Sequence, residues 1–113
     1  MLHQMKLYSV PFDRIKSGKK TLELRLYDEK RQQVKIGDEI EFRNTEKLQE
    51  KITVEVTALL LYKNFSDLVQ DLPAAYLGYK ESEKDYLKGS MYEVYTKEDE
   101  EKYGVLGIRI RLI

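Results

Sequence analysis

Apolar and polar residues alternate along five stretches of the chain, which is the pattern of β-strands with one buried face. The stretches are residues 5–10, 21–27, 39–43, 51–62 and 106–113. The apolar second half of the 51–62 stretch indicates a strand that is buried on both sides or bends across a barrel corner. The 106–113 stretch is so apolar that we expect it to pair inside the sheet.

Helix signals separate these strands. Residues 12–16 can form a short helix that Gly18 ends, Ser66 and Thr96 suit the N-caps of later helices, and Pro73 opens a further turn. The order predicts an α+β fold in one domain spanning residues 1–113. Several mostly antiparallel strands would curl into a small β-barrel, with short helices packed outside.

Charge and composition exclude several functional classes. Twenty basic residues balance twenty acidic ones, so any nucleic-acid surface must be local. There is no cysteine, and the only histidine, His3, lies in a terminus that we expect to fray. Serine-histidine triads, thiolate or histidine metal sites and phosphate-binding glycine motifs are missing. We therefore expect no metal and no cofactor.

The N-terminus lacks the apolar run of a signal peptide, and no stretch approaches the roughly 20 apolar residues that a membrane span needs. These features, with the missing cysteines, favour a cytoplasmic protein without membrane contact.

Six of the nine tyrosines lie between Tyr76 and Tyr103. Tyrosine joins an apolar ring to a hydrogen-bonding hydroxyl, so this region could provide half-buried packing or a surface on which bases stack. Packing is the commoner role of such residues, and both interpretations stay open.

The strongest candidate site is the start of the 21–27 strand. Glu23 and Arg25 are two residues apart on one strand face, with Cα atoms roughly 6.5 Å apart, and Lys20 comes just before them. An exposed ion pair of little consequence is one interpretation. In the other, Lys20 is a proton shuttle in a desolvated pocket, Glu23 holds or exchanges a proton and Arg25 binds an anion.

The sequence FDRIKSGKKTLELR at residues 12–25, followed by VKIGDEIEF at residues 34–42, resembles the signature of the ASCH family. The most specific part is Gly-x-Lys-Thr-x-Glu-x-Arg, which begins at Gly18. The resemblance implies a PUA-like β-barrel with a cleft for RNA or a modified nucleoside. Its ligand-binding residues would be Lys20, Thr21, Glu23 and Arg25.

A bacterial branch of that family, the acetylcytidine amidohydrolases, uses a lysine and a threonine of this motif and a later glutamate in catalysis. Lys20 and Arg25 match that branch, whereas Glu23 stands where the branch has its threonine nucleophile. Glu81 and Glu83 lie roughly where the later glutamate would fall, without a residue-by-residue match.

The sequence thus predicts an RNA- or nucleoside-binding domain with a charged cleft. The alternative is a small metal-independent hydrolase acting on an acylated nucleoside or on RNA, with Lys20 as its catalytic acid or base. A third hypothesis is that the same charges bind the peptide of a protein partner.

Overall fold

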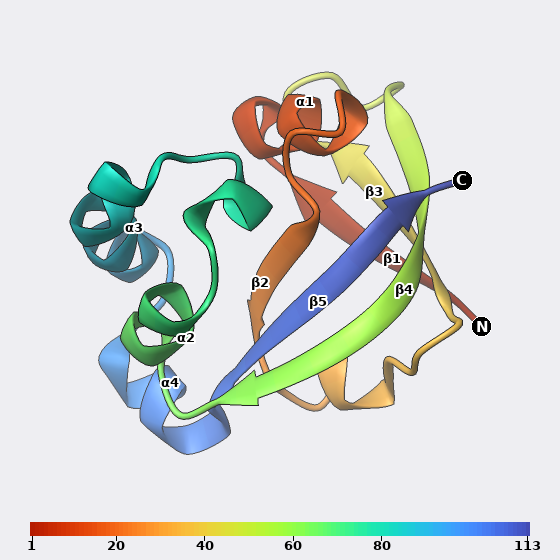
Figure 1. Cartoon of the computed structure of the whole chain (residues 1–113). Helices are drawn as coiled ribbons and strands as arrows, with labels where there is room; N and C mark the ends of the chain where they lie inside the picture. The colour runs from red at the N-terminus through yellow and green to blue at the C-terminus, as the bar shows by residue number, and fades with distance from the viewer.

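The alternating stretches form one five-stranded sheet with the order β1-β3-β4-β5-β2, in a computed structural model that describes all residues 1–113. The strands are β1 (Leu2–Leu7), β2 (Leu22–Leu26), β3 (Glu39–Asn44), β4 (Lys51–Tyr62) and β5 (Val105–Leu112). The sheet curls strongly, so that β1 comes round toward β2 in a half-barrel (Figure 1). The predicted α+β barrel is confirmed.

Three of the four strand pairings are antiparallel, and β1–β3 is parallel. The mostly antiparallel sheet is therefore confirmed, with one parallel pair that the local pattern did not predict. A register shift between Val56 and Ala58 interrupts the pairing of β4 with β5. It lies at the start of the apolar run 58–62, for which we expected either burial on both sides or a bend at a barrel corner. Bulges bend strands, and Leu61 is 61% exposed, so the run is not buried on both sides. The terminal strand, β5, lies inside the sheet as predicted.

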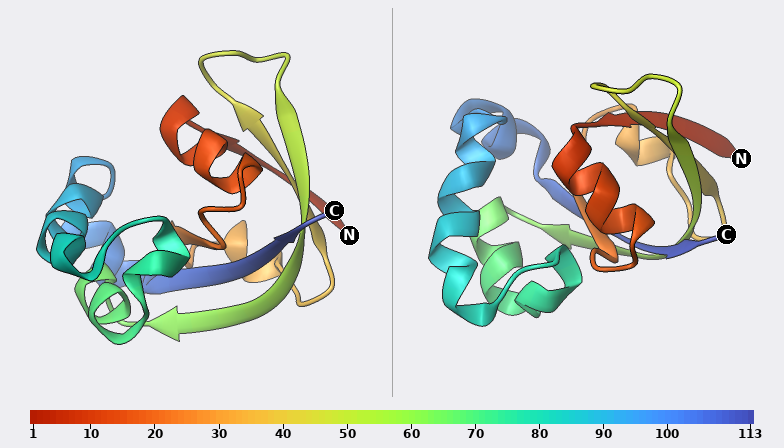
Figure 2. Two further views of the ribbon diagram at one scale, coloured as in Figure 1. Left: turned by 45° about the horizontal axis from the view of Figure 1, so that its top comes forward. Right: turned by 90° about the horizontal axis from the view of Figure 1, so that it is seen from above.

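Helices cover the curled sheet at two places (Figure 2). The α-helices are α1 (Ser9–Lys16), α2 (Phe65–Asp71), α3 (Lys84–Ser90) and α4 (Lys97–Tyr103), and short 3₁₀ turns are η1 (Arg31–Gln33), η2 (Ala74–Leu77), η3 (Glu81–Glu83) and η4 (Met91–Glu93). The first helix, α1, lies in the mouth of the half-barrel. The helices from α2 onward gather beside β2 and the adjacent ends of β4 and β5.

Two apolar cores follow from this arrangement. Phe12 and Ile15 of α1 are fully buried among residues of β1, β3, β4 and β5, inside the curl of the sheet. The three leucines of β2 belong to a second core with α2, η2 and α3. The opposite face of β2 is covered too, since Glu23 on that face is only 3% exposed.

The open side of the half-barrel, between the edge strands β1 and β2, is closed by side chains. Arg25 Nη2 donates to the carbonyl oxygen of Lys6 at 2.8 Å, and Lys30 Nζ donates to that of Gln4 at 2.9 Å. Each bond satisfies a backbone acceptor of β1 that a neighbouring strand would otherwise have used. Arg25 therefore has a structural role in addition to any role in a site.

Several sequence predictions near the N-terminus are corrected. The first strand runs from Leu2 to Leu7 and not through Val10, because Ser9 already begins α1. Pro11 falls in the first turn of α1, where a backbone N–H would have no acceptor within the helix, so proline is tolerated there. His3 is not frayed: it is 8% exposed, and its Nε2 lies 2.8 Å from Asp38 Oδ2.

One later prediction is also wrong in detail. Asn64, not Ser66, caps α2, since its side chain accepts a hydrogen bond from the backbone N–H of Asp67 at 2.7 Å. The predicted Thr96 cap of α4 is confirmed, and the acidic run that follows it contains one buried residue. Glu100 is buried, and its Oε2 accepts a hydrogen bond from the Phe65 N–H at 2.7 Å.

Candidate functional site

The turn between α1 and β2 brings Lys20 to the start of β2. Gly18 has φ of +82°, a conformation that glycine adopts without a Cβ penalty, and the Lys20 N–H donates back to the Arg14 carbonyl at 3.0 Å. The alternation of β2 then directs Glu23 and Arg25 to the face opposite its leucines. These three residues, Lys20, Glu23 and Arg25, are called the charged triad below.

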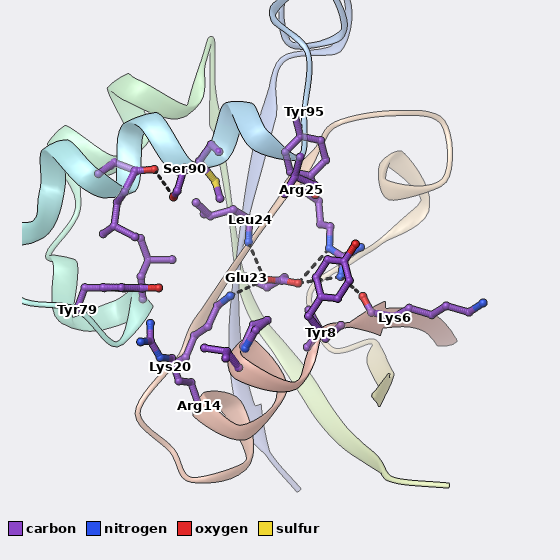
Figure 3. A pocket seen from close by; sticks show the side chains of 18 of the residues that line it. Lys6, Tyr8, Arg14, Lys20, Glu23, Leu24, Arg25, Tyr79, Ser90 and Tyr95 are labelled. Carbon is purple, nitrogen blue, oxygen red and sulfur yellow. Dashed lines mark hydrogen bonds and ion pairs between the residues drawn. The ribbon is translucent and has the colours of Figure 1, made fainter. Parts of the chain in front are cut away.

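Both oxygens of the Glu23 carboxylate are hydrogen-bonded within the triad (Figure 3). Lys20 Nζ donates to Oε1 at 2.8 Å, and Arg25 donates to Oε2 through Nε at 3.0 Å and Nη2 at 2.9 Å. The backbone N–H of Leu24 adds a longer bond to Oε1 at 3.2 Å. The carboxylate is 3% exposed and has little free capacity to accept a further bond.

The electrostatics of the triad keep this carboxylate ionised. Burial alone raises the pKa of Glu23, but the charges of Lys20 and Arg25 and their hydrogen bonds outweigh it and lower the pKa to about 2. Burial also disfavours the charged form of Arg25 and by itself lowers its pKa. The charge and hydrogen bond of Glu23 outweigh this effect, so the pKa of Arg25 is raised. At neutral pH Glu23 is a weak base that orients two cations.

The triad lies on the wall of a cavity of about 540 Å³ between the half-barrel and the helices. Eleven of the nineteen residues that line the cavity are hydrophobic. Most of a ligand in it would therefore contact apolar groups, with the triad as a concentrated polar feature. This composition is typical of small-molecule sites, whose volumes are roughly 300–1,000 Å³.

Three tyrosines and an arginine also line the cavity, and the sequence interpretation did not assign them. Tyr8, Tyr79 and Tyr95 come from three different segments, and the Arg14 guanidinium lies 4.0 Å from the centre of the Tyr79 ring. Tyr95 stacks on Phe65, at 5.0 Å between ring centres. The abundance of tyrosine signalled such surfaces, but which rings face a cavity depends on contacts between distant segments.

Thr21, the fourth predicted ligand-binding residue, does not line the cavity. Its backbone N–H donates to the Tyr76 carbonyl at 2.8 Å, and its own carbonyl accepts from the Ile110 N–H at 3.0 Å. Glu81 and Glu83 do not line it either, and each caps a backbone N–H, of Ala74 and of Lys80 respectively. The structure brings Lys20, Glu23 and Arg25 together and leaves the other candidates in local structural roles.

The triad offers hydrogen-bond donors to whatever enters the cavity. Lys20 uses one of the three protons on Nζ to bind Glu23, and Arg25 Nη1 makes no hydrogen bond within the protein. Two cations and one carboxylate also leave an excess of one positive charge. The wall is thus suited to carbonyl, hydroxyl or anionic oxygens.

No group of three or more His, Cys, Asp or Glu side chains is arranged to hold a metal ion. None of the helices is both long and apolar enough to cross a bilayer.

Comparison with known proteins assigns the chain to a family. The sequence profile of the ASCH domain matches residues 5–113, whereas no curated protein matches the chain. Hypothetical protein PH0355, in its crystal structure, is 33% identical with a TM-score of 0.86, and each chain is covered completely. Protein PF0455 from Pyrococcus furiosus is also 33% identical, with a TM-score of 0.70 over 100% of this chain and 98% of that one.

More distant structures share the fold. The ASCH domain from Lactobacillus crispatus JV V101 is 15% identical with a TM-score of 0.67, over 97% of this chain and 79% of that one. ASCH from Zymomonas mobilis is 14% identical with a TM-score of 0.64, over 97% and 66%. With a family profile that covers nearly all of the sequence, the chain belongs to the ASCH domain family.

Proposed function

We propose that this domain binds a nucleoside, or a nucleoside within a short RNA, in the cavity beside the charged triad. The observation that carries the proposal is the combination, in one cavity of about 540 Å³, of aromatic walls with the triad's free donors. Nucleobases stack on aromatic rings and present carbonyl acceptors at their edges. Membership of the ASCH family supports an RNA-binding or hydrolase-like role in general.

In this proposal the aromatic groups and the triad have different tasks. Tyr8, Tyr79 and Tyr95 provide rings against which a base can pack, and stacking contributes about 1–3 kcal/mol for each base. Lys20 and Arg25 donate to base or sugar oxygens, while Glu23 fixes the direction of both cations. The zero net charge of the chain favours a small ligand over a long RNA.

A second candidate function is hydrolysis of an acylated nucleoside or of RNA, with Lys20 as the catalytic residue. It is favoured by the position of Lys20 Nζ, whose side chain is only 12% exposed and held at the cavity wall by Glu23. Lys20 and Arg25 could polarise a carbonyl or phosphoryl oxygen. Glu23, with a pKa of about 2, is a poor general base in such a reaction.

The test is calorimetric titration with the four common nucleosides, acetylated cytidine and a short single-stranded RNA. Lys20→Met should weaken binding at least about ten-fold, because a hydrogen bond from a charged donor contributes about 1.5–3 kcal/mol. Lys19→Met is the matched control, since Lys19 is exposed and does not line the cavity. Absence of binding at millimolar concentration, or equal losses in the two variants, would refute the proposal.

Chromatography of the same mixtures distinguishes the second candidate from the first. A product that accumulates with the native protein and with Lys19→Met, but not with Lys20→Met, would establish catalysis. Unchanged ligand after prolonged incubation at saturating concentration would leave binding as the function of the site.

A further inference from the structure

A second groove lies on the outer surface beside the charged triad. It has a volume of about 510 Å³ and is lined by eight residues, of which one is hydrophobic. The lining residues come from β1, β3, Arg25 of β2 and the segment around η1. Five of them are cations, namely Lys6, Arg25, Lys30, Arg31 and Arg43, and the only carboxylate is that of Glu41.

Part of this positive charge is not neutralised locally, although Arg25 pairs with Glu23 and Arg31 with Asp28. Lys6 makes no ion pair, and Lys30 Nζ binds the neutral carbonyl of Gln4. Glu41 is shared by Arg43 at 3.7 Å and Lys51 at 3.5 Å, so one carboxylate serves two cations. On a chain whose net charge is zero, these residues form a local concentration of positive charge.

Two residues that line the groove, Arg31 and Glu41, each carry a buried polar atom without a hydrogen-bond partner. Arg31 binds Asp28 through Nη1 at 3.3 Å, but its buried Nε makes no hydrogen bond. Buried polar atoms are nearly always hydrogen-bonded, so this donor calls for an acceptor. An anion with several oxygens could bind the ammonium and guanidinium groups of the groove together.

The groove adjoins the cavity of the proposed function, and Arg25 stands between them. Lys6 and Arg25 line both. The Arg25 guanidinium lies at the boundary, with Nε and Nη2 directed to Glu23 and Nη2 also to the Lys6 carbonyl (Figure 3). A ligand in the cavity that extends past the Arg25 side chain would reach the groove.

We propose that the groove binds a phosphate group that is covalently attached to the nucleoside in the cavity. The inference rests on the proposed function and extends it, because it identifies the ligand as a nucleotide or as one residue of an RNA strand. Arginine and lysine side chains are the usual partners of phosphate oxygens, and such contacts orient a ligand without reading its base. The cavity would select the nucleoside, and the groove would provide affinity for its phosphate.

The experiment compares each nucleoside with its 5′- and 3′-monophosphates and with a ten-nucleotide RNA, all by calorimetry. The phosphate should tighten binding about ten-fold, and the double variant Lys30→Gln with Arg43→Gln should remove most of that gain while leaving nucleoside affinity unchanged. Both residues line the groove only. Arg111→Gln is the control for charge, because Arg111 is an exposed arginine that lines neither cavity.

The two sources of phosphate give different results. A gain that is complete with a monophosphate identifies a free nucleotide. A further gain in affinity with the RNA identifies a strand. The logarithm of the RNA binding constant should then fall by about 0.7 per phosphate contact for each ten-fold rise in salt concentration. Either gain supports the groove as a phosphate site, provided that the double variant removes it.

The outcomes separate this inference from the proposed function. Nucleosides that bind as tightly as nucleotides would refute the phosphate site and leave the proposed function intact. If no nucleoside or nucleotide binds, the proposed function is refuted, and inorganic phosphate tests the groove alone. Phosphate should then shift the amide resonances of Lys30 and Arg31 in the native protein but not in the double variant, and unchanged resonances would refute the site.

Discussion

Replacing Glu23 by glutamine tests whether a single buried carboxylate holds the charged triad together. The substitution Glu23→Gln would keep the shape of the side chain but leave Lys20 and Arg25, which are only 12% and 13% exposed, without their counter-ion. Removing one partner of a buried ion pair costs about 3–5 kcal/mol, since the other charge stays desolvated. We expect a large loss of stability from a change of one atom.

The pKa of Glu23 gives a second, independent value for the free energy that the ion pairs of Glu23 contribute to stability. Lowering it from 4.5 to about 2 corresponds to about 3 kcal/mol, because a ten-fold change in proton affinity is worth about 1.4 kcal/mol. The folded pKa is lower than the unfolded one, so this stabilisation is complete above about pH 5 and is lost as the pH falls toward 2. The difference between the native protein and Glu23→Gln should therefore shrink to about half near pH 3.

The assay is urea unfolding at pH 7, 4 and 3, followed by circular dichroism. The matched control is Glu55→Gln, which breaks the exposed ion pair with Arg111 at 3.0 Å and should cost less than about 1 kcal/mol. A cost below about 1 kcal/mol for Glu23→Gln at pH 7 would refute the reasoning. So would a cost that is the same at pH 3 as at pH 7.

Two further pairs of substitutions test the packing around the site by urea unfolding. Glu100→Ala should lower the free energy of unfolding by about 2 kcal/mol, because it leaves the buried N–H of Phe65 without its acceptor. Glu101→Ala, on the exposed face of α4, should lower it by less than about 0.5 kcal/mol. Equal losses in the two variants would contradict this role of Glu100. Gly104→Ala should lower the free energy of unfolding by about 2 kcal/mol, since Gly104 has φ of +74° and a Cβ would lie 3.3 Å from the Tyr62 carbonyl oxygen. Gly89→Ala in α3, where a Cβ meets open space, should instead raise the free energy of unfolding by about 0.5 kcal/mol. An unchanged stability of Gly104→Ala would contradict the prediction.

The strands could be predicted because each depends on neighbouring residues. Successive side chains of a strand point to opposite faces, so the alternation alone assigns the three leucines of β2 to one face. In the structure they do share one core. The parallel pairing of β1 with β3 has no such local signal, since it joins segments that α1 and β2 separate along the chain. Pairing of this kind is decided by the packing of the whole sheet.

The candidate site was predictable in its members but not in its surroundings. Alternation assigns Glu23 and Arg25 to the face opposite the leucines, a face that in many sheets meets solvent. Here that face is covered as well, with Glu23 only 3% exposed, so an apparent surface ion pair became a buried one. The burial of His3 could not be predicted either, because it depends on a contact with Asp38, which is thirty-five residues away along the chain.

The closure of the half-barrel by Arg25 and Lys30 affects how the protein behaves in concentrated solution. A bare edge strand is a template onto which another chain can add, and natural sheets protect such edges. In β1 the carbonyls of Gln4 and Lys6 are already occupied by these two side chains. A variant that lacks Arg25 would leave part of this edge free for strand addition, so the residue that lines the cavity also protects the protein against self-association.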